Sequence, residues 1–204
     1  HEPIRARQVA PNRWAVGGTP TDCVYLGFHE LLRRKPDLVL SGVNLGPNLG
    51  TDVHYSGTVA AAVEATLLGG NGIAVSCASK RDANFDHAAA FVRELAAWVL
   101  AQGGLPAGTT LNVNVPKGTP TQFQYTFLGH RPYDHSVDKR TDPRGNTYYW
   151  IGGNPQPHED EPGTDSSAIR AGLIAVTPMM LDTTEYAAVA NAPTLSGFES
   201  TSPI

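Results

Sequence analysis

The chain has 204 residues, of which 41% are hydrophobic and 17% are charged; it is long and apolar enough for one α/β domain with an appendage. Its formal net charge of −4 argues against a protein that binds duplex nucleic acid, because such a protein presents a basic face. No apolar run has the length of a transmembrane helix, and none at the start has the character of a signal peptide.

The first twenty residues have the pattern of a β-hairpin, with alternating strands over 4–7 and 14–16. A helix is predicted next: Thr19 is its cap, Pro20 suits the first helical position and Asp22 the capping-box position. We expect this helix to end near Arg34. An α/β domain usually begins with a parallel strand in the sheet centre, and none precedes the hairpin. We therefore expect a further segment before His1.

The middle of the chain alternates predicted strands with predicted helices, which indicates an α/β sheet. A buried parallel strand is expected at 38–41 because a short apolar run is bounded there by polar residues and turn residues. The elements that follow are a helix over 59–68, a strand over 73–76, a long helix over 84–102 and a strand over 111–116.

From residue 118 the sequence changes to short aromatic runs, over 122–128 and 148–151, which predict a projecting β-hairpin arm. Thr164 or Asp165 then caps a short helix, a strand returns over 173–178, and one helical segment is expected near 184–190. The resulting division is an α/β core over 1–117 and 164–182, an arm over 118–163 and a C-terminal tail over 183–204.

The glycine-rich loop after the first predicted parallel strand holds the candidate site. Its sequence, SGVNLGPNLG, has neither the dinucleotide-binding nor the P-loop spacing and contains no lysine. Asn44 and Asn48 offer carbonyl oxygens, which suit hard cations such as Mg²⁺, Mn²⁺ or Ca²⁺. Both residues equally suit left-handed turns.

Ser56, Gly57 and Thr58 open the helix that follows this loop. Hydroxyl groups beside the free N–H groups of a helix start form a phosphate cradle, and Gly57 would let a ligand approach closely. Ser56 is equally well explained as a simple helix cap. Because the strand end and the helix start meet in one crevice, we expect an anion site there.

Other candidate groups are weaker. His54 is a candidate proton donor beside the site, and Asp22 and Asp52 are candidate metal-linked acids, although capping explains Asp22 better. No G-x-S-x-G motif is present, so a hydrolase triad has no support. Cys23 and Cys77 lie far apart without a C-x-x-C pair. We expect two buried thiols in a reducing cytoplasm rather than a disulfide or a zinc site.

Several segments resemble the SurE family, the survival-protein E phosphatases, also called 5′/3′-nucleotidases. The segments are GTPTDCVYLG (18–27), the whole stretch 36–65, LNVNVP (111–116), DPRGNTYYWIGG (142–153) and GTDSSAIRAGLIAVTP (163–178). The resemblance implies a Rossmann-like three-layer fold with a mostly parallel sheet, a β-hairpin extension and a C-terminal tail exchanged between subunits. It also implies a homodimer or tetramer that hydrolyses nucleoside 5′- and 3′-monophosphates, and often polyphosphate, with a divalent metal.

By the same resemblance, one divalent ion is held by two adjacent aspartates after the first strand, by a loop serine and by the asparagine of the S-G-[IV]-N block, Asn44 here. Mg²⁺ and Mn²⁺ suit it alike, and Ca²⁺ is a further candidate. Asn48, Ser56, Gly57 and Thr58 would line the phosphate pocket. The aspartates, one of which would be the nucleophile or base, and the loop serine are not in these 204 residues. We expect them upstream.

Two other classes of function stay open at this point. The chain is alternatively a non-catalytic nucleotide-binding or regulatory module that uses the same cradle; it would then bind nucleotide regardless of EDTA and release no phosphate. A third reading is a structural subunit that dimerises through the arm and the tail.

Overall fold

The computed structural model describes residues 3–133, 136–152 and 161–191. Its centre is a five-stranded sheet in the order β3-β4-β5-β9-β6. The expected α/β class and mostly parallel sheet are confirmed: β3, β4 and β5 run parallel, β9 is antiparallel to β5, and β6 is parallel to β9. The strands are β3 (Val39–Leu45), β4 (Gly72–Cys77), β5 (Thr109–Val115), β6 (Phe123–Tyr125) and β9 (Ile174–Met180).

Five α-helices accompany the sheet in the described residues: α1 (Pro20–Leu26), α2 (Gly57–Leu67), α3 (Phe85–Ala101), α4 (Asp165–Arg170) and α5 (Tyr186–Ala190). The Thr19–Asp22 capping box that starts α1 is confirmed. A wider helical turn, η1 (Gly27–Leu31), continues α1, and the backbone becomes extended at Leu32. The helix therefore ends before Arg34. The helical segment expected near 184–190 is α5, and the rest of the tail, residues 192–204, lies outside the described residues.

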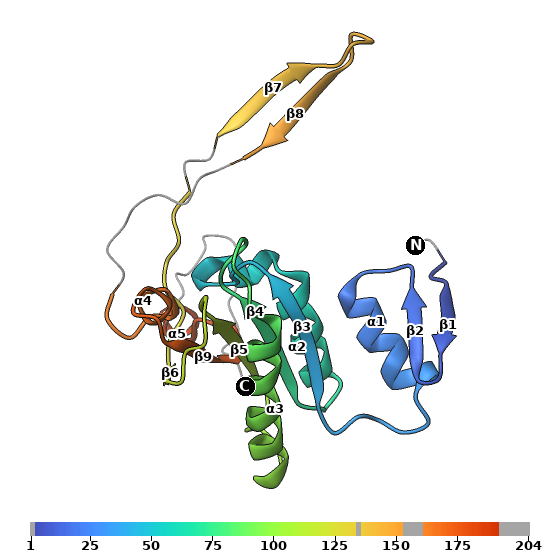
Figure 1. The fold of residues 1–204 in the computed structure, drawn as a ribbon, viewed down its shortest axis with the longest axis vertical. Coiled ribbons are helices and arrows are strands. Elements are labelled where there is room, and N and C mark those ends of the chain that lie inside the picture. Colours follow the sequence, from blue (N-terminus) through green and yellow to red (C-terminus); the bar gives the residue numbers. More distant parts are fainter. Residues whose placement is uncertain (1–2, 134–135, 153–160, 192–204) are drawn as a thin grey trace, which may run out of the picture.

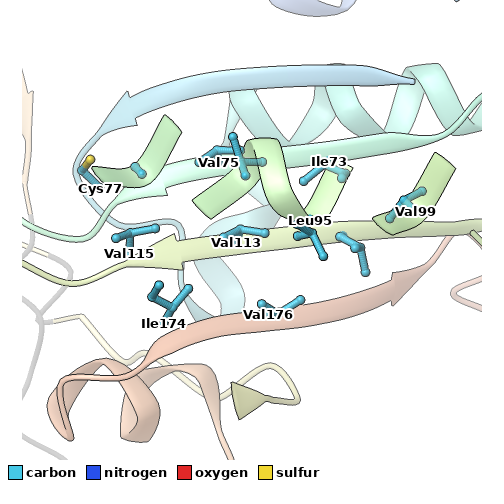
Figure 2. Packing of buried hydrophobic residues seen from close by; sticks show 12 residues of the cluster. Ile73, Val75, Cys77, Leu95, Val99, Val113, Val115, Ile174 and Val176 are labelled. Carbon is cyan, nitrogen blue, oxygen red and sulfur yellow. The ribbon is translucent and has the colours of Figure 1, made fainter. Parts of the chain in front are cut away.

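The two faces of the sheet are covered by different helices (Figure 1). Ile73, Val75 and Cys77 of β4 pack with side chains of α3, whereas Ala74, on the opposite face, packs with side chains of α2. Figure 2 shows the α3 side, where Leu95 and Val99 lie over the aliphatic residues of the sheet. Burying each such side chain stabilises the fold by about 1.5–3 kcal/mol.

Three details differ from the sequence-based expectations. Trp98, a large apolar residue of α3, is 51% exposed, because it lies one position off the stripe of Val92, Leu95 and Val99. Leu40 is half exposed rather than buried, because β3 pairs only with β4 in the described sheet. Cys77 is buried as expected, but Cys23 is exposed, and both thiols are free.

Strand β3 is longer than expected and includes the whole SGVN block. Gly42 makes this possible: its φ is +127°, and a Cβ there would overlap the carbonyl oxygen of Val75. Pairing of β3 with β4 shifts its register between Ser41 and Asn44. Asn44 therefore lies at the end of a strand and not in the loop that follows.

Two hairpins stand apart from the central sheet. The expected N-terminal hairpin is confirmed as β1 (Ala6–Ala10) and β2 (Arg13–Val16). The second, β7 (Val137–Thr141) with β8 (Thr147–Ile151), projects from the body as an arm (Figure 1). Strand β6, within the segment assigned to the arm, belongs to the central sheet. Within the described part, no helix is both long and apolar enough to cross a membrane.

Candidate functional site

A cavity of about 800 Å³ lies where the loop after β3, the short 3₁₀ helix η2 (Gly50–Tyr55) and the start of α2 meet the base of the arm. Of the five site residues implied by the family resemblance, two line it, Asn48 and Ser56. Asn44, Gly57 and Thr58 are not among its lining residues. The other lining residues are Pro47, Thr51, Asp52, Tyr55, His130, Arg131, Pro132, Tyr133, Ile151 and Gly152.

Asn48 is held by buried side chains and is only 7% exposed. Its backbone N–H donates to Asn114 Oδ1 at 2.9 Å, and its own Nδ2 donates to Ser76 Oγ at 2.7 Å. Its carbonyl oxygen accepts from Nδ2 of both Asn112 and Asn114. The left-handed-turn interpretation is wrong for Asn48 and for Asn44, since Asn12 is the one non-glycine residue with positive φ in the described chain.

Asn44 presents an oxygen atom. Its Nδ2 donates to the carbonyl oxygen of Gly46 at 3.0 Å, which leaves Oδ1 without a hydrogen-bond donor from the described residues. A neutral amide oxygen is a ligand that hard divalent cations accept. Asn44 would be one such ligand. The described residues contain no cluster of three or more His, Cys, Asp or Glu side chains able to hold a metal.

The start of α2 combines a helix cap with a wall of the cavity. Ser56 is the N-cap, and its Oγ accepts the backbone N–H of Val59 at 3.2 Å. Gly57 also lies close to α1. A Cβ at this position would lie 3.2 Å from Pro20 Cγ, so the glycine makes room for that helix as well.

Asp52 lies inside an ion-pair cluster. Its Oδ2 pairs with Arg131 Nη1 at 2.7 Å, both side chains being 19% exposed, and the Tyr133 hydroxyl donates to the carboxylate at 2.8 Å. The Arg131 guanidinium lies 5.8 Å from the centre of the Tyr133 ring. Burial raises the pKa of Tyr133, and the bond to Asp52 raises it further. Asp52 therefore ties η2 to the arm, which argues against a role as a metal-linked acid.

Asp165, in the first turn of α4, fixes both sides of the cavity. The side chain is fully buried. Its Oδ2 accepts the backbone N–H of Gly50 at 2.7 Å, and its Oδ1 accepts those of Gly129 at 3.1 Å and Ser166 at 2.8 Å. Gly50 is required there, since a Cβ on it would overlap the carbonyl oxygen of Gly129. Thr164, not Asp165, is the cap of α4.

Sequence reasoning missed His130, Arg131 and Tyr133, and it placed His54 beside the site. His54 is exposed and does not line the cavity. The sequence around the arm-base residues gives no sign that they belong to the site. Arg131 lies 79 positions from its partner Asp52, so only the folded chain brings the two together. The sequence around Asn112 and Asn114 does give such a sign. They alternate with Leu111, Val113 and Val115 in a strand that is buried almost throughout, and asparagine is unusual in a buried strand.

Comparison with known proteins gives a consistent set of relatives. Residues 1–135 match the family model described as Survival protein SurE. The "5'-nucleotidase SurE" of Anaeromyxobacter dehalogenans (strain 2CP-C) is 52% identical over 187 residues, which are 90% of this chain and 73% of that protein. The protein of the same name from Desulforudis audaxviator is 47% identical over 196 residues, covering 93% of this chain and 76% of its own length.

The fold has a solved counterpart as well. The crystal structure of the SurE protein from Aquifex aeolicus superposes with a TM-score of 0.81 at 39% sequence identity. The match covers 94% of this chain and 79% of the Aquifex chain.

Proposed function

Because the chain belongs to the SurE family, we propose that it is a phosphatase that hydrolyses nucleoside monophosphates to nucleoside and phosphate. The observation that carries this proposal is the cavity. It begins at the start of α2 and continues to the base of the arm, with a volume of about 800 Å³. That volume is in the range of pockets for whole small molecules, and a phosphate group alone would fill little of it.

The phosphate would bind at the start of α2. This helix has eleven residues, so the N–H groups of its first turn and its dipole favour an anion. Ser56 would donate its hydroxyl, and Gly57 and Thr58 their backbone N–H groups, to phosphoryl oxygens. Asn48 belongs to the same pocket. Since its Nδ2 is bound to Ser76, its Oδ1 would accept a bond from a water or a substrate hydroxyl.

The nucleoside would bind beside the phosphate, against aromatic and apolar groups. Tyr55, Tyr133 and Ile151 line the same cavity, and Tyr55 is 92% exposed. Flat aromatic rings stack on nucleobases regardless of base identity. These residues support a preference for nucleotides over smaller phosphate esters. Both 5′- and 3′-monophosphates, and polyphosphate, belong to the proposed substrate range.

We include a divalent metal ion, Mg²⁺ or Mn²⁺, in the proposal, with Asn44 Oδ1 as one of its ligands. Such an ion neutralises charge on phosphoryl oxygens and lowers the pKa of a bound water. Asn44 fits this role because its amide nitrogen is bound to Gly46 and its oxygen is not engaged by the described residues. The two aspartates and the serine implied by the family pattern are not in the 204 residues.

The test is phosphate release from AMP by the protein with Mg²⁺ or Mn²⁺ present and again with excess EDTA. We expect release that EDTA abolishes, and we expect Asn44→Ala to weaken Mn²⁺ binding in a direct titration. Nucleotide binding without phosphate release, unaffected by EDTA, would favour the non-catalytic module instead. Unchanged Mn²⁺ binding in Asn44→Ala would contradict the ligand assignment.

We further propose that the arm packs against a second copy of the chain, in a homodimer or tetramer in the cytoplasm. Every residue of β7 and β8 is exposed, Trp150 and Tyr149 among them, and a lone two-stranded hairpin is marginally stable in water. Trp150→Ser should therefore lower the dimer fraction in sedimentation experiments, while Trp98→Ser, on α3, should not. A monomeric wild type would contradict the proposal.

A further inference from the structure

Strand β5 has two buried faces of opposite character. Leu111, Val113 and Val115 pack in the apolar cluster under α3; Figure 2 shows Val113 and Val115 there. Thr110, Asn112 and Asn114 lie on the other face and are equally buried, with no exposed surface. Successive residues of a strand point to opposite sides of its sheet, so the polar side chains form one row, which runs toward the loop that carries Asn48.

Two residues of this row, together with Ser76 of the neighbouring strand β4, bind the backbone N–H, the carbonyl oxygen and Nδ2 of Asn48. Asn114 accepts from its N–H, Asn112 and Asn114 donate to its carbonyl oxygen at 2.8 and 2.9 Å, and Ser76 of β4 accepts from its Nδ2. Four hydrogen bonds from three buried side chains therefore converge on one residue of the cavity wall. Because those side chains stand on two paired central strands, Asn48 is fixed relative to the rigid part of the molecule.

The arrangement is not the most stable one available to this face. Asn112 Oδ1 is the one buried side-chain polar atom in the described chain without a hydrogen-bond partner. Leaving such an atom unpaired costs on the order of 1–3 kcal/mol, and an aliphatic side chain of similar volume would avoid that cost. A local loss of stability of this kind is typical of positions retained for function.

We propose that Ser76, Asn112 and Asn114 are positioning residues, which hold Asn48 and its loop in the geometry that substrate requires. None of the three lines the cavity, so they act through Asn48. The expected effect on kinetics rests on the proposed phosphatase function. The positioning of Asn48 itself does not.

The experiment compares Ser76→Ala, Asn112→Leu and Asn114→Leu with Thr110→Val as a matched control. Thr110 lies in the same polar row and is equally buried, but its hydroxyl bonds to Thr66 Oγ1 at 2.7 Å and not to Asn48. For each variant the thermal midpoint, the kcat and KM for AMP, and hydrogen exchange of the Asn48 amide are measured.

We expect kcat/KM to fall about tenfold or more in Asn114→Leu and Ser76→Ala, a loss of about 1.4 kcal/mol of transition-state stabilisation. The kcat/KM of Thr110→Val should stay within about twofold of the wild-type value. Its thermal midpoint should fall by as much as that of Ser76→Ala, or by more. Asn112→Leu should lower kcat/KM while keeping or raising the midpoint. Exchange at the Asn48 amide should accelerate most in Asn114→Leu, which removes the acceptor of that N–H, less in Ser76→Ala and Asn112→Leu, and not in Thr110→Val. If Asn114→Leu does not fold, the smaller change Ser76→Ala carries the kinetic test.

Equal kinetic losses in the control and the three variants, or unchanged exchange at Asn48 in Asn114→Leu, would overturn the positioning role. Absence of phosphate release from the wild-type protein would instead count against the proposed function. The exchange data and AMP binding would then still decide whether the three residues hold Asn48.

Discussion

At the scale of single residues, hydrogen bonding decides which side-chain atoms remain for a ligand. Asn44 and Asn48 both use Nδ2 within the protein, toward Gly46 and Ser76, and both therefore offer oxygen. Asp52, the carboxylate nearest to the cradle in sequence, is committed to Arg131 and Tyr133. Asn44, Asn48 and Ser56 are thus neutral groups, and the carboxylate of Asp52 is paired with Arg131.

Tyr133→Phe tests the bond to Asp52. The folded protein raises the pKa of this hydroxyl, so its contribution to stability is full below the ordinary tyrosine pKa near 10 and is lost as the pH rises through the folded value. We expect the substitution to lower the free energy of unfolding by about 1 kcal/mol at pH 7 and by less at pH 10.5, in urea titrations. Tyr149→Phe, on the arm, is the control. An equal deficit at both pH values would contradict the assigned cause.

At the scale of elements, periodicity and capping predicted most helices and strands, because those signals are local. The capping box of α1, the cap of α2 at Ser56 and the extent of α3 follow from neighbouring residues. The extension of β3 through Gly42 did not, because it depends on pairing with β4. The bonds of Asp165 could not be predicted from neighbouring residues either, because Gly50 lies 115 positions and Gly129 lies 36 positions from it in the chain.

Asp165→Asn tests whether α4 holds the two sides of the cavity together. The substitution keeps the shape but replaces one acceptor oxygen with a donor facing a backbone N–H. We expect a loss of roughly 2–3 kcal/mol in the free energy of unfolding, since bonds to charged groups are the stronger ones and the site is buried. Asp86→Asn, in the exposed first turn of α3, should cost far less. Equal losses in the two variants would show that Asp165 acts only as a first-turn acid.

At the scale of the whole molecule, the two faces of the central sheet differ in the side chains that they carry. The α3 side is aliphatic, while the α2 side carries the polar row that supports Asn48. The arm base closes the cavity from the opposite direction. The sequence located the cradle because strand, loop and helix start are contiguous. It did not reveal the arm-base wall, since only the folded chain brings residues 130–133 and 151–152 to the cradle.

The central claim is that nucleotide binds in this cavity, with its phosphate at the start of α2. The measurement that tests it most directly is the KM for AMP of Ser56→Ala beside Asn84→Ala. Both variants lose a helix N-cap whose side chain accepts a backbone N–H, at about 1 kcal/mol each, but only Ser56 lines the cavity. We predict a KM raised about tenfold in Ser56→Ala and within about twofold of wild type in Asn84→Ala. The same KM in both variants would contradict the claim.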